Sequence, residues 1–234
     1  MSYKKNQASF VLLGLILLSM SMWTCSSKSP LTGESKNNEP NRLISFTIDS
    51  SRSYVDDYRP LFQNGDINVV VEIPTGTTQK WEVDKKTGHL KWQMINDTPR
   101  IINYIGYPGN YGMIPKTLLS KESGGDGDPL DVLVLGNPIN RGKVVRCKLI
   151  GILKMSDHGE NDDKLIAVQL NSPMKAIQNI TNLEEEYKGV SEIIKVWFSN
   201  YKGSNLIKVM GYADLEQARN ILNLSIEEYK ESKL

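Results

Sequence analysis

Short runs of apolar and β-branched residues, separated by turn-forming residues, recur through the central part of this chain. Each run has the length of a strand rather than of a helix, and the runs lie at 68–73, 132–135, 144–153, 165–170 and 207–210. Two alternating segments, 80–83 and 90–94, flank a turn at Lys86-Thr87-Gly88, which predicts a hairpin. The chain is therefore expected to fold mainly as β-sheet.

Two stripes of apolar residues at helical spacing follow nearer the C-terminus. The first runs from Val190 to Tyr201 and the second from Leu215 to Tyr229. Asp214 stands at the N-cap position of the second stripe, with Gln217 at the capping-box position. Strands followed by helices favour an antiparallel barrel or sandwich with two C-terminal helices packed on it, an α+β arrangement.

The N-terminal segment has the composition of an export signal. Lys4 and Lys5 precede an apolar run of fourteen residues, 10–23, which is shorter than the roughly 20 residues of a membrane-spanning helix. Cys25 follows this run after one residue, Thr24, and the pattern resembles a bacterial lipoprotein signal, in which that cysteine is acylated. We expect residues 1–24 to be a signal peptide and Cys25 to be lipidated; an uncleaved anchor and a plain secreted protein are the alternatives.

The segment that begins with this cysteine, residues 25–52, is rich in Ser and also contains Lys, Asn, Pro and one Gly, the composition of a flexible linker. The folded domain is expected at 53–234, held at a membrane on its periplasmic or cell-surface side. The formal net charge is +1, so composition indicates no nucleic-acid partner. Cys147 lies in an alternating, strand-like run and is expected in the core.

Three carboxylates lie within six residues, directly before an apolar run. Asp126, Asp128 and Asp131 therefore crowd the start of the strand expected at 132–135, where like charges raise one another's pKa. Mg²⁺ and Ca²⁺ prefer oxygen ligands and would remove that cost. An EF-hand loop needs Gly at its sixth position and Glu at its twelfth. Counted from Asp126, these positions hold Asp131 and Asn137, so an EF-hand is excluded. A solvated acidic turn is the alternative.

A second acidic set spans 157–163 and is followed by Lys164. It predicts either an exposed loop after the strand at 144–153 or a second contribution to one shared cation site. Lys80 and Glu82 stand two residues apart in a strand and share a face. That pair suits either a metal–phosphate ligand or a set of cross-strand salt bridges.

Taken in order, the motifs of residues 68–212 resemble those of the family I soluble inorganic pyrophosphatases. The most specific is Asp126-Gly127-Asp128-Pro129-Leu130-Asp131-Val132, and its flanks match in the family's order at 71–74, 80–82, 107–112, 145–147, 151–157, 162–164 and 201–202. The resemblance implies a five-stranded OB-like barrel with helices at its side. It also implies a magnesium-dependent enzyme that hydrolyses pyrophosphate to two phosphates.

The same resemblance implies a role for each matching residue. Asp128 is the expected general base, and Tyr107 supports the acidic site. Six carboxylates are expected to hold metal ions: Asp126, Asp131, Asp157, Asp162, Glu82 and, through water, Glu72. Six side chains are expected to bind phosphate oxygens: Lys80, Arg100, Tyr111, Lys164, Tyr201 and Lys202. The resemblance implies several Mg²⁺ ions per site, with Mn²⁺ or Zn²⁺ as substitutes. It also implies that the protein forms a homo-oligomer.

The segment between Gly88 and Tyr107 is longer than in typical short bacterial members, and Arg100 is its only arginine, which makes it the expected phosphate-binding one. Two other functions fit parts of the pattern. A catalytically inactive module would bind metal or phosphate without turnover, although Asp128, Lys80 and Lys202 are intact. An OB-type nucleic-acid binder would need a basic groove with aromatic platforms, whereas the expected barrel mouth is acidic.

Overall fold

The computed structural model describes residues 46–48, 51–203 and 206–234. The expected signal peptide and Cys25 lie outside these residues, so both stay predictions. None of the helices in the described part of the chain is long and apolar enough to span a bilayer.

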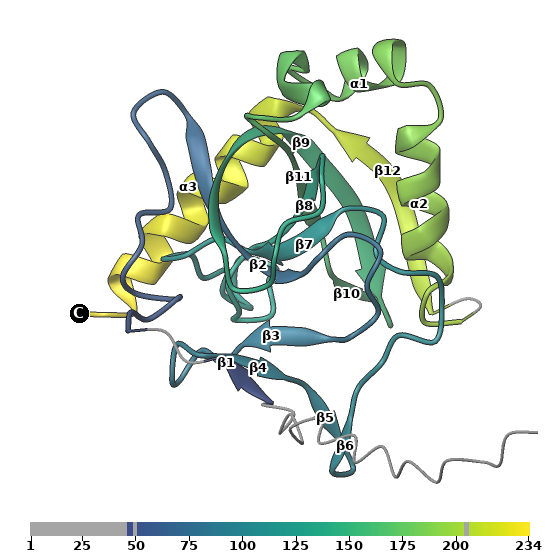
Figure 1. Ribbon diagram of the computed structural model, residues 1–234. Coiled ribbons are helices and arrows are strands. Elements are labelled where there is room, and N and C mark those ends of the chain that lie inside the picture. Colours follow the sequence, from purple (N-terminus) through teal and green to yellow (C-terminus); the bar gives the residue numbers. More distant parts are fainter. Residues whose placement is uncertain (1–45, 49–50, 204–205) are drawn as a thin grey trace, which may run out of the picture. The chain divides into compact units, whose positions relative to one another are not determined.

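Five strands close into a barrel (Figure 1). They are β2 (Asp66–Ile73), β7 (Asn110–Met113), β8 (Asp131–Leu135), β9 (Val144–Asp157) and β11 (Lys164–Gln169). The order of pairing is β9-β11-β8-β7-β2, and β2 pairs with β9 to complete the circle. All of these pairs are antiparallel except β8 and β11, which run parallel. The expected five-stranded OB-like barrel is confirmed.

Strand β9 is longer than expected and carries two more partners along its length. It continues from Val144 to Asp157, where the sequence predicted an end near Leu153 and an exposed loop. Its last residues pair with β10 (Glu160–Asn161), and its part from Ile152 to Asp157 pairs with β12 (Ile207–Ala213). The second acidic set is therefore a hairpin at the end of a strand rather than a loop that follows one.

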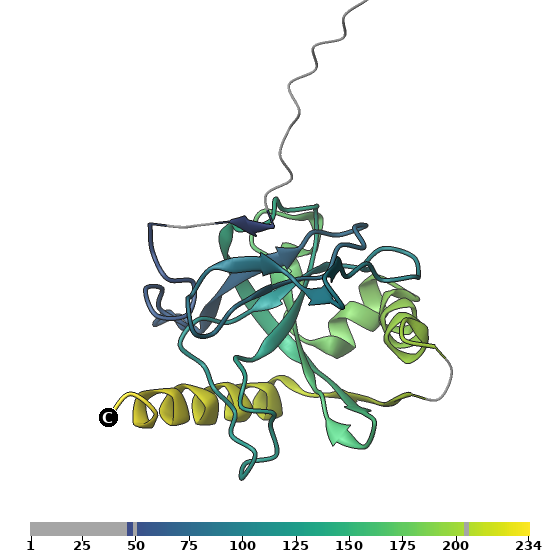
Figure 2. The same ribbon diagram turned by 90° about the horizontal axis from the view of Figure 1, so that it is seen from below.

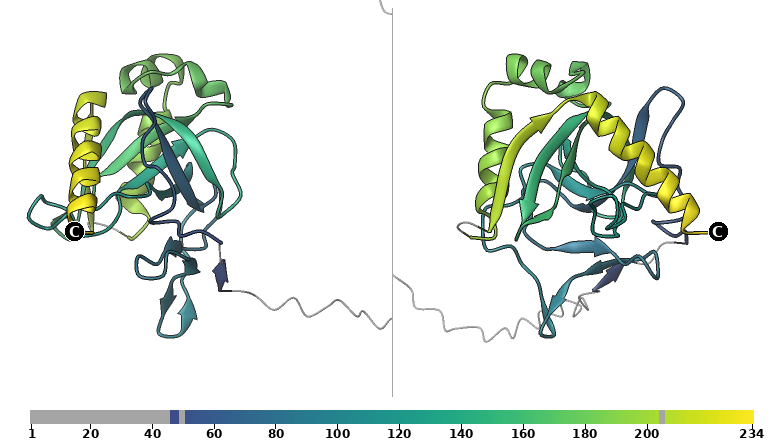
Figure 3. Two further views of the ribbon diagram at one scale, coloured as in Figure 1. Left: turned by 90° about the vertical axis from the view of Figure 1, so that its left-hand side faces the viewer. Right: turned by 180° about the vertical axis from the view of Figure 1, so that it is seen from behind.

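A small sheet and a hairpin lie to one side of the barrel (Figure 3). The sheet contains β1 (Thr47–Ile48), β4 (Leu90–Trp92) and β3 (Trp81–Val83) in that order, so the hairpin predicted around 86–88 is present, and β1 lies within the segment expected to be linker. The second hairpin joins β5 (Met94–Ile95) to β6 (Thr98–Pro99), and its turn residues Asn96 and Asp97 both have positive φ, as a tight two-residue turn requires.

The described residues contain three α-helices where the sequence predicted two. The predicted pair is α2 (Val190–Asn200) and α3 (Leu215–Glu231), and Asp214 caps α3 by accepting a hydrogen bond from Gln217 N at 2.9 Å. The additional helix α1 (Ile180–Glu186) follows a 3-10 turn, η1 (Pro173–Ala176). Only two of its residues are buried, which is too few to form a recognisable stripe.

Helices α2 and α3 cover different sides of the barrel (Figure 2). Alternate residues of β8 point to opposite faces of the sheet. Val132 and Val134 belong to a cluster that includes Leu222 of α3, whereas Leu133 and Leu135 belong to a second cluster. That second cluster receives Ile194, Trp197 and Phe198 from α2. The continuous apolar run of β8 is thus explained by burial on both faces.

Strand β7 lies in a segment, 107–113, whose Pro, Gly and Asn residues favour a loop. Its Gly112 pairs with Val71 of β2 and Val132 of β8, and a Cβ at this position would lie 1.8 Å from Val70 O. The glycine is therefore needed for close strand packing rather than for a turn. Cys147 is fully buried, as predicted.

Candidate active site

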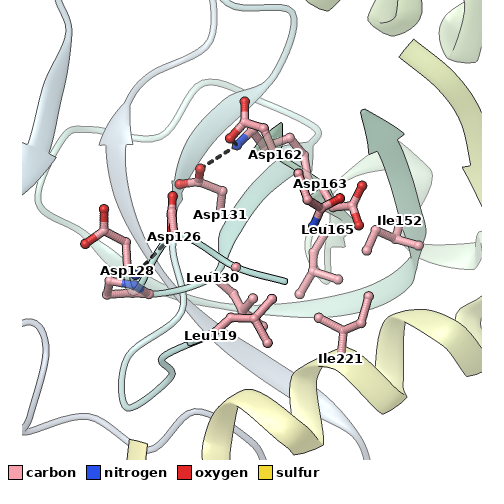
Figure 4. A pocket seen from close by; sticks show the side chains of 14 residues that line it. Leu119, Asp126, Asp128, Leu130, Asp131, Ile152, Asp162, Asp163, Leu165 and Ile221 are labelled. Atoms are coloured by element: carbon pink, nitrogen blue, oxygen red, sulfur yellow. Dashed lines mark hydrogen bonds and ion pairs between the residues drawn. The ribbon is translucent and has the colours of Figure 1, made fainter. Parts of the chain in front are cut away.

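The parallel pairing of β8 with β11 places the first residues of both strands at the same end of the barrel. Asp131 opens β8 and Lys164 opens β11. Lys164 is only 3% exposed, and its Nζ donates to Asp131 Oδ2 at 2.6 Å and to Asp162 Oδ1 at 2.5 Å. Figure 4 shows Asp131 and Asp162 on the two sides of this contact. One buried ammonium group therefore joins the two acidic segments predicted separately.

The loop before β8 adds two further carboxylates. Asp128 N donates to Asp126 Oδ1 at 2.9 Å, and Gly127 between them has φ +81°, a conformation that favours glycine. Asp126, Asp128, Asp131 and Asp162 line one pocket, with apolar side chains from the barrel and α3 beneath them (Figure 4). Four of the predicted site carboxylates thus meet at one surface.

An adjoining pocket brings in the residues of β2 and β3. It shares Asp126, Asp128 and Asp131 with the first pocket and is also lined by Glu72, Lys80 and Glu82. Glu72 is 4% exposed and accepts a hydrogen bond from Val83 N at 2.6 Å. Burial raises the pKa of Glu72 to about 8, against the opposing charge of Lys80.

The carboxylates of Asp131 and Asp162 differ in their pKa although both contact Lys164. For Asp131, burial favours the neutral form, but the charges of Lys164 and Lys80 outweigh it, and the pKa lies below its usual value. For Asp162, burial dominates over the charge of Lys164, and the pKa is raised. Lys80 and a hydrogen bond from Tyr111 contribute to lowering the pKa of Asp131, whereas the charge of Asp131 helps to raise the pKa of Asp162.

Asp157 and Lys202 form a separate ion pair beside this surface. Asp157 ends β9, and Lys202 lies just beyond α2. Burial favours the neutral form of Asp157, but the hydrogen bond from Lys202 prevails and the pKa of Asp157 is lowered. The neighbouring Tyr201 is stacked on Trp197, with ring centroids 4.6 Å apart and an interplanar angle of 11°.

Tyr107 and Tyr111 belong to a cluster of aromatic rings next to the acidic residues. The Tyr107 ring lies 4.4 Å from that of Trp197 and 5.1 Å from that of Tyr111, and Lys80 Nζ lies 5.2 Å from the Tyr111 ring centroid. Burial and the charge of Asp131 raise the pKa of both tyrosines. Both hydroxyls therefore stay protonated at neutral pH.

Arg100 lies further from the centre than the resemblance implied. Its Nη1 donates to Gln93 Oε1 at 2.6 Å, and Gln93, rather than Arg100, lines the pocket around Glu72 and Lys80. The charge of Arg100 nevertheless acts on Tyr107, where it opposes the rise in pKa. Its predicted contact with phosphate stays a prediction.

The donor set fits a hard divalent cation in its chemistry. The candidate ligands are carboxylate oxygens, which Mg²⁺ prefers. Within the described residues, no three carboxylate, imidazole or thiol side chains converge closely enough to bind a metal as they stand. Lysine ammonium groups pair with the carboxylates instead, as at Asp131 and Asp157. Metal ions would therefore compete with these lysines for the carboxylates.

Two residues of the site were not singled out in the sequence. Asp163 is buried beside Asp162, accepts a hydrogen bond from Met155 N at 3.0 Å and pairs with Lys154. Lys85 reaches from the β3–β4 turn to Asp128. Asp163 could have been found from its place next to Asp162, whereas nothing in the sequence near Lys85 indicates its contact.

Comparisons with known proteins agree on one family. The family described as inorganic pyrophosphatase matches residues 69–230. An inorganic pyrophosphatase of Ralstonia nicotianae is 38% identical over 170 residues, which cover 70% of this chain and 91% of that protein. Among solved structures, an inorganic pyrophosphatase from Schistosoma japonicum has a TM-score of 0.72 at 29% identity, covering 76% of this chain and 71% of that one. The enzyme from Helicobacter pylori has a TM-score of 0.63 at 32% identity, covering 75% and 99%.

Proposed function

Because this chain belongs to the inorganic pyrophosphatase family, we propose that it hydrolyses pyrophosphate to two phosphate ions with the help of divalent metal ions. The observation that carries the proposal is the meeting of carboxylates and ammonium groups in two adjoining pockets at one end of the barrel. Carboxylates alone would repel pyrophosphate, and ammonium groups alone would bind it without activating water. A site that contains both suits a substrate that reaches the enzyme as a metal complex.

Mg²⁺ is the metal we propose, several ions per site, with Mn²⁺ or Zn²⁺ as substitutes. When bound, such ions would supply Lewis-acid chemistry: they would lower the pKa of water toward about 7 and offset charge on the phosphates. Asp126, Asp131 and Asp162 are the proposed main ligands. Asp157, Glu82 and, through water, Glu72 are the proposed further ones. Two observations support these roles. Every proposed ligand offers carboxylate oxygens, and all of them except Asp157 line the two pockets, which Lys80 also lines.

The remaining residues are proposed to accept the proton of the attacking water and to bind the phosphates. Asp128 is the proposed general base: it takes a proton from the water whose oxygen attacks one phosphorus atom, while the bridging P–O bond breaks. Six side chains are proposed to hold phosphate oxygens and to offset the charge that develops on the leaving phosphate, namely Lys80, Arg100, Tyr111, Lys164, Tyr201 and Lys202. Lys164 and Lys202 are supported by their positions, since each contacts a carboxylate proposed as a metal ligand and would lie close to a phosphate bound beside it.

The test is phosphate release from pyrophosphate by the purified protein, with Mg²⁺ and with a chelator. The variant Asp131→Asn should lose metal-dependent turnover, since Asp131 lines both pockets. The matched control is Asp97→Asn, which makes the same change at an exposed turn between β5 and β6 and should leave turnover unchanged. Near-normal turnover in Asp131→Asn would refute the assignment, and no turnover in the wild type with metal still bound would indicate an inactive binding module.

We further propose that Cys25 is acylated and that the protein is an exported lipoprotein, held at a membrane on its periplasmic or cell-surface side. The support is the apolar run 10–23, which ends two residues before Cys25. The variant Cys25→Ala should move from the membrane to the soluble fraction after cell lysis. Unchanged membrane association would point to an uncleaved anchor instead.

A homo-oligomer is also proposed. Its support is the exposed apolar surface of α2, where Ile193 and Val196 are 59% and 56% exposed; Ile105, whose backbone oxygen accepts a hydrogen bond from Trp197 of α2, is 67% exposed. Light scattering on the purified protein measures the number of chains per particle, and a monomer at micromolar concentration would refute this part of the proposal.

A further inference from the structure

Lys85 contacts the proposed general base from the opposite side of the site. Its Nζ forms an ion pair with an oxygen of the Asp128 carboxylate and donates to Gly127 O at 3.1 Å. The two segments joined in this way are 43 residues apart in the sequence. Within the described residues, no other side chain forms a hydrogen bond or ion pair with the Asp128 carboxylate.

The backbone that carries Lys85 is fixed to the barrel. On one side, Val83 N donates to the buried Glu72 carboxylate at 2.6 Å. On the other side, the Asp84 carboxylate accepts hydrogen bonds from Lys86 N at 3.0 Å and Thr87 N at 2.8 Å, which shape the turn. The hydrogen bond from Lys91 holds the pKa of Asp84 at about 2, so this carboxylate stays ionised and the turn keeps its shape at neutral pH. Lys85 therefore extends from a rigid support.

The backbone of Asp128 is fixed as well, from a different direction. Gly127 N donates to Leu119 O at 2.8 Å, and Leu119 N donates to Asp128 O at 3.2 Å. These bonds hold the loop but leave the rotation of the Asp128 side chain undetermined. The ion pair with Lys85 is the contact that fixes where this carboxylate points.

From these contacts we propose that Lys85 is a positioning residue, which orients the Asp128 carboxylate toward the attacking water. The inference rests on the proposed function, since it assumes that Asp128 accepts the proton. Both side chains are about half exposed, at 53% and 51%, and exposed ion pairs contribute little to stability. The contact therefore matters for the orientation of the base rather than for folding.

The test compares Lys85→Met with Lys86→Met in steady-state hydrolysis of magnesium pyrophosphate. Lys85→Met keeps the aliphatic stem and removes the ammonium group. A positioned base contributes roughly 10²- to 10⁴-fold, and misorientation removes part of this, so we expect kcat to fall about tenfold with KM within about twofold. Lys86 is exposed on the same turn and has the same charge without a contact to Asp128, so Lys86→Met should keep kcat.

Two further variants separate positioning from other roles. Lys85→Arg keeps a long cationic donor and should restore most of kcat. In an Asp128→Asn background, Lys85→Met should cause no further loss, because a residue that acts through Asp128 has nothing left to orient.

Three results would overturn the inference. The first is an unchanged kcat in Lys85→Met, which would mean a surface ion pair only. The second is a raised KM at constant kcat, which would mean that Lys85 binds substrate. The third is a multiplicative loss in the double variant. Failure of the proposed function would look different, because the wild type would then release no phosphate.

Discussion

Replacement of Lys164 by methionine tests whether one buried ammonium group holds the acidic site together. Methionine keeps an unbranched apolar side chain of similar length and removes the ammonium group with its charge and its hydrogen-bond donors. In the wild type, Nζ lies 2.6 Å from an oxygen of Asp131 and 2.5 Å from an oxygen of Asp162, and the lysine side chain is 3% exposed. In Lys164→Met the two carboxylates would face each other without the cation between them.

The expected cost follows from burial on each side of the pair. Removal of one partner of a fully buried ion pair costs about 3–5 kcal/mol. The side chains of Asp131 and Asp162 keep 32% and 21% of their surface exposed, so water compensates part of the loss. In the absence of divalent cations, we expect the free energy of unfolding to fall by about 2–3 kcal/mol.

The loss should depend on pH in a defined direction. Lys164 helps to hold the pKa of Asp131 below its ordinary value of 3.8. A carboxylate with a lowered pKa stabilises the folded state above its unfolded pKa, and this contribution disappears as the pH falls through the folded pKa. The difference between wild type and variant should therefore be full near pH 7 and should shrink below about pH 4.

Urea unfolding in the presence of a chelator, followed by tryptophan fluorescence, measures this difference, since Trp197 is 1% exposed and reports on the core. The control is Lys230→Met, which removes an ion pair with Glu227 whose side chains are 61% and 64% exposed, and which should cost less than about 0.5 kcal/mol. If Lys164→Met were as stable as this control at pH 7, or if its deficit were the same at pH 3 as at pH 7, the reasoning would be wrong.

Three other substitutions test separate parts of the structure. Arg100→Ala should raise KM for pyrophosphate in steady-state assays if the guanidinium reaches phosphate. An unchanged KM would mean that Arg100 contacts Gln93 but does not bind the substrate. Gly112→Ala places a Cβ 1.8 Å from Val70 O and should leave little folded protein by circular dichroism, because the strands cannot separate without loss of the barrel. Asp214→Ala removes the N-cap of α3 and should lower the free energy of unfolding in urea by about 1 kcal/mol; a change near zero would mean that water replaces the cap.

The elements that local pattern predicts well are those whose burial repeats regularly. Helix α3 was predicted from its stripe and its cap, and β8 from a run that is buried on both faces. Strand β7 was not predicted, because glycine and asparagine are weak strand formers and here satisfy close packing against β2. Helix α1 was missed since only Ile180 and Leu183 of it are buried.

The contacts within the candidate site also differ in whether they can be predicted from the sequence. Asp126, Asp128 and Asp131 stand within one short segment, so their proximity is visible in the sequence. The contact between Asp131 and Lys164 depends on the parallel pairing of two strands that are 33 residues apart, which periodicity does not reveal. The contact of Lys85 with Asp128 depends on how two loops lie across the barrel mouth, and it is visible only in three dimensions.

The parallel pairing of β8 and β11 has a consequence for the way the protein refolds. The residues of the site come from segments between Glu72 and Lys202 that meet only when the barrel closes. Contacts between residues distant in sequence form slowly, because chain entropy is lost before they are made. Hydrolytic activity should therefore return with the last step of refolding, after the helical signal in circular dichroism. The time at which enzyme turnover returns would then measure when the barrel closes.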